Sequence, residues 1–555
     1  MRQALTLFTC AVLMLAFSLR GFAQERYLDA VFSDVMKTDT LVYGTNVSIA
    51  PIILEGAMAP QPVNLYMDLY EPMGDTVSER PLIVFAITGT FFPAYVNGGF
   101  TGERSDIAVV DFAERMAKKG YVVAVVQYRR GWNAVGSATV QQKTILEAAY
   151  RGIQDVRNAV RFFRASYEGM ADIDRDGMPD GEANPFNIDP TRIAVGGTGT
   201  GGYMAYGATY LKRYEQTLKT KFIDFDQNPP EPFLDTTLLA DPYGITQAAL
   251  NIPNYPTYSS DFNIGFAFGG ALGDISWVEA GDAPFVSLHC ERDPGAPYEI
   301  GDVIAIDGTT NPASPFAVIP GGAGGLAVLR KADSLGNQDV FRNQVMSDDT
   351  LLTIGSTKSG GIAGLYPFDT PYEPGDAMCQ GTGVPGDTIQ EWGGPWNLFN
   401  ETVGAATWNA VFADQIATDD QVTGEVAVCL NKRGNPNDPA IGAAYMDTLE
   451  GFLTPHLVAG LNITTSVTGI NDFVEDENVE VFPNPANNIL NIEYRDGIKM
   501  LEGVRLMDLN GRTVRNYENL QTISFELQRE NLTPGLYILQ VSLPDGVVNK
   551  KILFE

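Results

Sequence analysis

An acidic run between residues 172 and 182 has the residue types and the spacing of a cation site. Its sequence is Asp172-Ile-Asp174-Arg-Asp176-Gly-Met178-Pro-Asp180-Gly-Glu182. Alternating carboxylates on a tight turn present oxygen atoms to one hard cation, and a glycine at the bend allows the sharp turn. The run therefore predicts a structural Ca²⁺ site whose ligands are Asp172, Asp174, Asp176, Asp180, Glu182 and the backbone carbonyl of Met178.

This acidic loop resembles the calcium loops of dockerins and of thrombospondin type 3 repeats. It departs from an EF-hand at the last ligand, because Ala183 occupies the twelfth position and Glu182 comes one residue early. The other interpretation is a solvated acidic turn that binds no ion. We place the loop in an insertion of about residues 170–189, just before a predicted strand.

A glycine-rich turn, Gly197-Thr198-Gly199-Thr200-Gly201, is the second candidate site. It follows a predicted strand at residues 192–195 and precedes a predicted helix at about 203–214. A strand, a strained turn of small residues and a helix are the setting of the G-x-S-x-G motif, which exposes a nucleophilic serine. In this sequence Gly199 takes the serine position, and glycine has no side chain that could attack a carbonyl.

The motifs around this turn resemble those of α/β-hydrolases of the esterase and lipase type. The resemblance spans about residues 63–297 and includes residues 87–91 (oxyanion loop), 120–129 (a strand ending in Tyr-Arg), 154–163 (the helix before the turn) and 288–297 (the acid loop). It implies a nucleophile slot at Gly199, an acid slot at Asp293 and oxyanion slots at Gly89, Thr90 and Thr200.

The histidine of a catalytic triad has no good candidate in this sequence. His289 stands beside Asp293, where the family often has a structural histidine, and His456 lies late in the predicted closing helix. Thr198 or Thr200 is an alternative nucleophile, but a threonine hydroxyl without a nearby base is poorly activated. We therefore expect a pseudo-hydrolase that binds a small or ester-like ligand or acts at a surface.

Two other functions stay open. An active carboxylic-ester hydrolase would use non-standard catalytic residues. A purely structural surface protein would have lost its pocket.

The elements that position these residues alternate between strand and helix. Continuous apolar runs predict buried strands at residues 81–87, 121–128, 192–195 and 284–288, and helical patterns occur at residues 106–119, 145–167, 203–214 and 443–461. This alternation predicts an α/β fold with a doubly wound, mostly parallel sheet and an active site at the carboxyl ends of the strands. Residues 301–439 are rich in Gly, Pro, Asp and Thr, so we expect long loops and a lid there.

The end of the chain has a different pattern, with short alternating strands and tight turns after a polar linker at residues 462–477. It contains Val481-Phe-Pro-Asn-Pro-Ala-Asn-Asn and later Pro534-Gly-Leu-Tyr-Ile-Leu-Gln-Val. Residues 478–555 resemble the type A sorting domain of the type IX secretion system of Bacteroidetes. This resemblance implies a small β-sandwich and a partner in that secretion machinery.

Other features place residues 24–461, the hydrolase-like domain, outside the cytoplasm. Residues 1–23 have the pattern of a signal peptide, and no later segment has the length of an apolar span, so we expect a secreted or cell-surface protein. The formal net charge of −31 argues against a nucleic-acid partner. Of the cysteines, Cys290 is expected to be a buried thiol, and Cys379 is expected to pair with Cys429.

Overall fold

The computed structural model describes residues 25–93, 96, 101–291, 293, 295–305, 316–344, 350–368, 439–463, 479–495, 500–507, 513–543 and 546–554. The chain divides into two compact units, one formed by residues 26–465 and one that contains residues 466–555. The predicted signal peptide, the predicted Cys379–Cys429 pair and the part of the predicted lid between residues 369 and 438 lie outside the described residues.

The larger unit is built on an eight-stranded sheet with the strand order β1-β2-β4-β3-β5-β8-β9-β12. Its strands are β1 (Val35–Ser48), β2 (Gln61–Pro72), β3 (Arg80–Ala86), β4 (Val122–Val126), β5 (Ile188–Thr198), β8 (Ile264–Phe268), β9 (Phe285–Cys290) and β12 (Leu365–Phe368). The β1–β2 and β2–β4 pairs are antiparallel, and all other pairs are parallel. This confirms the α/β class with a mostly parallel sheet.

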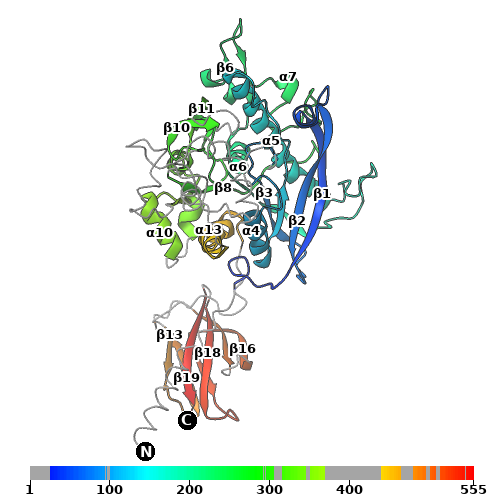
Figure 1. Cartoon of the computed structure of the whole chain (residues 1–555). Helices are drawn as coiled ribbons and strands as arrows, with labels where there is room; N and C mark the ends of the chain where they lie inside the picture. Colours follow the sequence, from blue (N-terminus) through cyan, green and yellow to red (C-terminus); the bar gives the residue numbers. More distant parts are fainter. Residues whose placement is uncertain are drawn as a thin grey trace, which may run out of the picture. The chain divides into compact units, whose positions relative to one another are not determined.

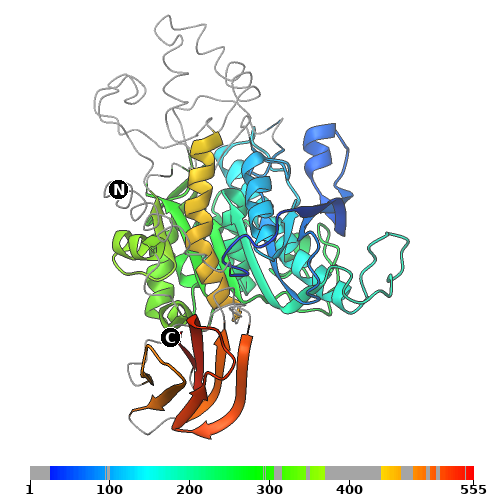
Figure 2. The same ribbon diagram turned by 90° about the horizontal axis from the view of Figure 1, so that it is seen from below.

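Helices cover both faces of this sheet. They are α2 (Ala50–Glu55), α4 (Ile107–Lys118), α5 (Ala138–Tyr167), α6 (Thr200–Tyr210), α7 (Thr236–Leu239), α8 (Gly325–Ser334), α9 (Asp339–Gln344), α10 (Thr350–Ser359) and α13 (Pro439–Gly460). The helices α4 and α13 pack together on one face (Figure 2). The helices α5 and α6 contact each other on the other side of β3 and β8 (Figure 1).

Both faces of the central strands are therefore buried, which explains their continuous apolar sequences. Every residue of β3 and β4 is buried. The thiol of Cys290, at the end of β9, is also buried, as expected. The active-site edge of such a sheet lies at the carboxyl ends of its parallel strands, where β3 and β5 both lead into glycine-containing turns.

The region between residues 300 and 368 differs from the prediction of long loops. It contains the strand pair β10 (Ile300–Ala305) and β11 (Phe316–Ala323), the helices α8, α9 and α10, and the parallel strand β12. The expectation was wrong in this part. The elements are short, and α10 distributes its apolar residues without a clear helical face, so the glycine-rich and threonine-rich composition masked them.

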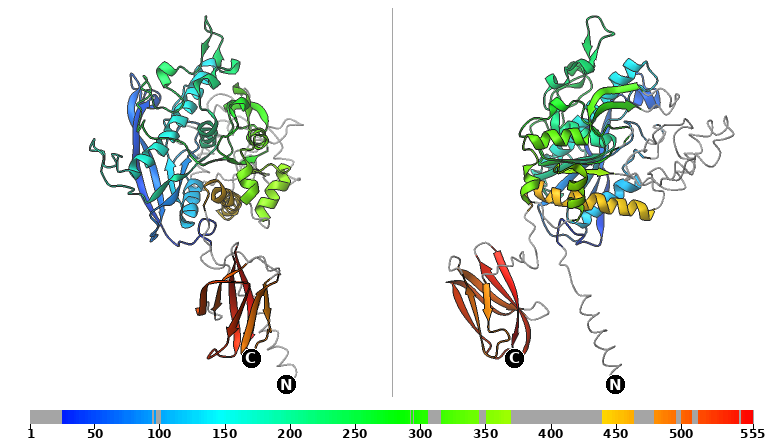
Figure 3. Two further views of the ribbon diagram at one scale, coloured as in Figure 1. Left: turned by 180° about the vertical axis from the view of Figure 1, so that it is seen from behind. Right: turned by 90° about the vertical axis from the view of Figure 1, so that its left-hand side faces the viewer.

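The C-terminal unit consists of two antiparallel sheets with a common apolar core (Figure 3). One sheet has the order β13-β14-β17 and the other β16-β15-β18-β19. The strands are β13 (Val479–Phe482), β14 (Ile489–Tyr494), β15 (Leu501–Met507), β16 (Thr513–Thr522), β17 (Ser524–Gln528), β18 (Gly535–Leu543) and β19 (Gly546–Phe554). Among the described helices of the whole chain, none has the length and apolarity needed to cross a bilayer.

Candidate active site at the turn after β5

The turn between β5 and α6 has the strained backbone that the motif requires. Gly199 has φ 53° and ψ −116°, a combination open mainly to glycine. Its amide donates a hydrogen bond to the carbonyl of Phe268 at 2.9 Å, and its carbonyl accepts one from the amide of Tyr203. Gly201 lets α6 approach β3, since a Cβ there would lie 2.0 Å from the carbonyl oxygen of Ala86. The geometry of a nucleophile elbow is thus present.

The slot where a nucleophile would project is filled by another residue. A Cβ placed on Gly199 would lie 2.2 Å from Oγ1 of Thr88, which follows β3. Real Cβ atoms do not approach a neighbour this closely. The turn therefore has neither a side chain at its tip nor room for one while Thr88 keeps this position.

Thr198 is the last residue of β5 and precedes the tip of the turn. Its side chain is buried, and its hydroxyl has no hydrogen-bond partner among the described residues. It lines a cavity of about 10 Å³ that it shares with Thr88, Asp106 and mostly apolar side chains. This volume is close to the minimum for a single water molecule, so no substrate reaches the Thr198 hydroxyl through this cavity.

Thr200 lies at the first position of α6, and its Oγ1 is 3.0 Å from the phenol oxygen of Tyr128. Burial raises the pKa of Tyr128 to about 12, although the hydrogen bond with Thr200 opposes this shift. At neutral pH the phenol is protonated, so Tyr128 does not act as a base toward Thr200.

The predicted oxyanion residues lie in the turn after β3. Gly89 and Thr90 both have positive φ, 124° and 51°. The hydroxyl of Thr90 donates to the carbonyl of Gly89, and the carbonyl of Thr90 accepts from the indole of Trp132 at 2.9 Å. These bonds fix the turn, and the exposed side chain of Thr90 does not enter the elbow slot as a nucleophile.

Asp293, in the acid slot, is held by the backbone of its own loop. One carboxylate oxygen accepts hydrogen bonds from the amides of Gly295 and Ala296 at 2.8 and 3.1 Å. Burial raises the pKa of Asp293, while the nearby His289 and these amides oppose the shift.

His289 is engaged on both ring nitrogens. Nδ1 accepts from the amide of Gly325 at 3.3 Å, and Nε2 lies 3.0 Å from the carbonyl of Ala296. Because a carbonyl only accepts, the proton is on Nε2. Burial lowers the pKa of His289, which keeps the ring neutral. The ring has the contacts of a structural histidine.

His456 lies on α13 and is also buried. Its Nδ1 donates to the carbonyl of Phe452 at 2.7 Å, and its ring packs against Phe341 and Phe452. Within the described ranges, no hydrogen bond connects either histidine with residues 198–200.

Asp106, just before α4, is a titratable group near the turn that the sequence did not reveal. It lines the small cavity beside Thr88 and Thr198, and it accepts hydrogen bonds from the amides of Gly102 and Glu103 at 2.7 and 3.1 Å. Burial raises the pKa of Asp106 to about 6, with Glu103 adding to the shift and the amides and Arg130 opposing it. In the sequence, Asp106 stands out only as the first residue of the predicted helix at 106–119.

The raised pKa of Asp106 predicts a pH-dependent stability. The protonated carboxyl of Asp106 makes its full contribution to stability below pH 4, near the pKa of this group in the unfolded chain. That contribution is lost as the pH rises through 6, the pKa in the folded protein. Asp106→Asn keeps an oxygen that accepts both amides but carries no charge. Relative to the parent, we expect this variant to gain about 1–2 kcal/mol in unfolding free energy between pH 4.5 and 7.5, measured by urea denaturation. A pH-independent difference, like that expected of the exposed control Glu55→Gln, would contradict this.

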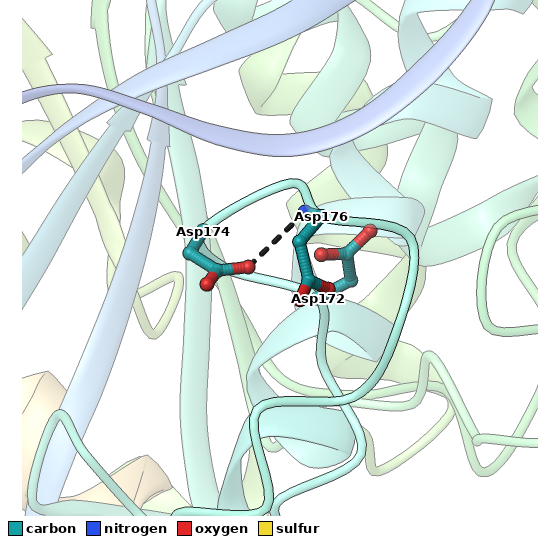
Figure 4. A group of neighbouring side chains, drawn as sticks. All are labelled: Asp172, Asp174 and Asp176. Carbon is teal, nitrogen blue, oxygen red and sulfur yellow. Dashed lines mark hydrogen bonds between the residues drawn. The ribbon is translucent and has the colours of Figure 1, made fainter.

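The acidic loop brings three of the six predicted ligands together (Figure 4). Carboxylate oxygens of Asp172, Asp174 and Asp176 lie within 4.8 Å of one another. The amide of Asp176 donates to Asp174, and the carboxylate of Asp180 accepts from the amide of Ile173, which folds the loop back on itself. The side chains of Met178 and Glu182 are exposed. Gly177 has φ 93°, the bend that the sequence predicted.

Solved structures similar to this chain include esterase 2 of Thermogutta terrifontis. The form phosphorylated by paraoxon has 17% identity and a TM-score of 0.27, and the match covers 47% of this chain and 73% of that one. The propionate-bound form has 16% identity and a TM-score of 0.27, covering 47% and 74%. The apo form has 17% identity and a TM-score of 0.24, covering 42% and 70%. At these TM-scores the likeness adds nothing to what the sheet and the turn show directly.

No curated protein matches the chain. Residues 480–555, however, match the family described as the secretion system C-terminal sorting domain. The match coincides with the strands β13 to β19 of the C-terminal unit and agrees with the motifs read from the sequence. The last part of this chain is therefore a secretion system C-terminal sorting domain, which indicates a secreted or cell-surface protein.

Proposed function

We propose that this protein is a pseudo-hydrolase: its α/β-hydrolase-like body retains the elbow but binds a ligand without cleaving it. The C-terminal domain would engage the type IX secretion machinery for export. The observation that carries the proposal is the elbow itself, where Gly199 offers no nucleophile and Thr88 occupies the vacated position. The contacts of His289 support it, because its ring nitrogens face the amide of Gly325 and the carbonyl of Ala296.

The test is an ester-hydrolysis assay on the purified protein with p-nitrophenyl butyrate. We expect no turnover above that of the heat-denatured protein. The variants Thr198→Ala and Thr200→Ala are expected to show the same background rate. Turnover by the parent that disappears in either variant would overturn the proposal and establish an active hydrolase with a non-standard nucleophile.

A second candidate function, an active ester hydrolase that uses Thr88, has one observation in its favour. The Thr88 hydroxyl lies where a nucleophile would project from Gly199. Against it, the described residues provide no hydrogen-bond acceptor for this hydroxyl, and an unactivated threonine is a weak nucleophile. Thr88→Ala in the same assay decides the matter, since only this candidate predicts a rate that falls to background.

The acidic loop is proposed to hold a structural Ca²⁺ ion. The three clustered aspartates provide hard oxygen ligands, which is the chemistry that Ca²⁺ prefers. We expect Ca²⁺ at about 100 times its Kd to raise the unfolding free energy by about 2–3 kcal/mol relative to EDTA, measured by thermal melting. Asp174→Asn should abolish this difference, and the exposed control Asp226→Asn should retain it. A melting temperature of the parent that is equal in Ca²⁺ and EDTA would contradict the site.

A further inference from the structure

A cavity of about 60 Å³ lies between α5 and α6, away from the Gly199 slot. Its walls include Leu146 and Ile153 from α5 and Leu211, which directly follows α6. Phe222 and Trp277, which belong to the short 3-10 helices Thr220–Phe222 and Ile275–Trp277, cover it. These five side chains are at least nine-tenths buried, so the cavity belongs to the interior of the body.

The cavity presents mainly carbon atoms and no charge. Its polar side chains direct their protons elsewhere: Tyr150 donates to the carbonyl of Ala240, Thr217 to that of Tyr214, and Trp277 to that of Gln216. Tyr203 likewise donates to the carbonyl of Gly295. None of the lining residues is charged. A polar or charged group placed in this cavity would therefore lose its hydration without gaining a donor.

Three residues of the lining are partly exposed, and we place the entrance of the cavity at them. Ala149 on α5, Tyr203 on α6 and Ile319 on β11 line the cavity and also reach solvent. At its inner side Gly207 lets the two helices approach, since a Cβ there would lie 2.2 Å from Cδ1 of Ile153. A ligand can therefore place one end between the helices and leave the other end at the entrance.

The size of the cavity selects among apolar groups. An engineered apolar cavity of roughly 150 Å³ binds benzene. The cavity between α5 and α6 has less than half of that volume, so a six-membered ring does not fit without moving the walls. A narrow, unbranched alkyl group does fit.

From these observations we infer that the α5–α6 cavity binds the unbranched aliphatic end of an uncharged ligand. The inference deepens the proposed binding role by naming the class of ligand. It uses a site other than the elbow, so the ester assay and a binding measurement at this cavity can fail independently. A failure here would leave the proposed loss of catalysis intact, and turnover at the elbow would leave this cavity intact.

The experiment compares 1-hexanol with cyclohexanol by isothermal titration calorimetry on the full chain. The two alcohols have the same number of carbons and one hydroxyl each, and they differ in width. We expect saturable binding of 1-hexanol and affinity for cyclohexanol that is weaker by at least about tenfold. Equal affinities, or no saturable binding of 1-hexanol, would overturn the inference.

Three variants locate the binding. Ala149→Leu fills the entrance from a partly exposed position and is expected to weaken 1-hexanol binding by at least about tenfold. Ala138→Leu, the same change at an exposed position of α5 outside the cavity, should leave binding unchanged. Leu234→Ala enlarges the cavity and should improve the binding of cyclohexanol. If Ala149→Leu binds 1-hexanol as the parent does, the alcohol binds elsewhere and the inference is wrong.

Discussion

Gly199→Ser, which restores the serine of the motif, is expected to hydrolyse no ester and to lower the unfolding free energy by about 1–3 kcal/mol. The new Cβ would lie 2.2 Å from Oγ1 of Thr88, so that Thr88 or the turn must shift. The residue would also keep a φ of 53° with a ψ that side chains rarely adopt. Urea denaturation measures the loss of stability, and p-nitrophenyl butyrate measures the activity.

The steric part of this effect can be separated from the backbone part. Gly56 also has a positive φ, 70°, but a Cβ there meets nothing within 4 Å. Gly56, with ψ 25°, lies in the left-handed helical region and not in the φ 53°, ψ −116° region of Gly199. Gly56→Ser therefore reports the cost of a left-handed serine that collides with nothing, and we expect it to be milder. The double variant Gly199→Ser/Thr88→Ala should recover part of the stability that Gly199→Ser alone loses, because the colliding hydroxyl is gone.

Activity in Gly199→Ser would contradict this prediction, although the parent would still lack a nucleophile as proposed. It would mean that a base and an oxyanion site are still assembled around the slot and that only the nucleophile was lost. Equal stability of Gly199→Ser and the parent would instead show that Thr88 rotates freely out of the slot. The hydrogen bonds of His289 and Asp293 favour neither outcome, since they connect these residues with their own loop and with α8.

The central strands were predictable because burial on both faces leaves a strong sequence signal. The predicted runs at residues 81–87 and 121–128 correspond to β3 and β4 within two residues at each end. The strand β8, with the sequence IGFAF, was missed because a five-residue run beside glycines resembles a loop. The edge strand β1 was missed because its first half is exposed and polar, so that alternation is weak.

Local backbone geometry at the candidate site was also predictable, while contacts between distant segments were not. Glycines at 197, 199 and 201 indicate a tight turn by themselves. That Thr88 fills the slot depends on the register of β3 beside β5, which pairs Ala86 with Gly197. The pKa shift of Asp106 likewise depends on burial near α13, because Met446 lines the same cavity. Such long-range packing leaves no periodic trace in the sequence.

The start of α5 illustrates a missed local signal. The sequence indicated a helix at residues 145–167, whereas α5 begins at Ala138. Ser137 caps it by accepting a hydrogen bond from the amide of Val140. A serine before Ala-Thr-Val is an ordinary N-cap, but the polar first turns gave no apolar stripe to extend the prediction.

Asp155→Asn is expected to have the largest effect on stability, a loss of about 3–5 kcal/mol in unfolding free energy. Asp155 on α5 accepts hydrogen bonds from the backbone amide and the Nε of Arg129 at 2.7 and 2.8 Å, and both side chains are fully buried. An asparagine leaves the guanidinium of Arg129 without its counter-charge in the interior.

The surrounding charges make the loss of unfolding free energy in Asp155→Asn larger than the loss expected for an isolated ion pair. Arg151 is fully buried on the same helix, and burial together with the charge of Arg129 lowers the pKa of Arg151 to about 10. Without the carboxylate, the repulsion between the two buried guanidinium groups is no longer offset by a negative charge. Urea denaturation at pH 7 measures the change, with Glu279→Gln as the control, because Glu279 pairs with Arg213 at the surface and its loss should cost little. If Asp155→Asn is as mild as this control, the hydrogen bonds that Arg129 donates to the carbonyl of Leu250 and to Oε1 of Gln154 are enough to stabilise its guanidinium, and the buried ion pair is dispensable.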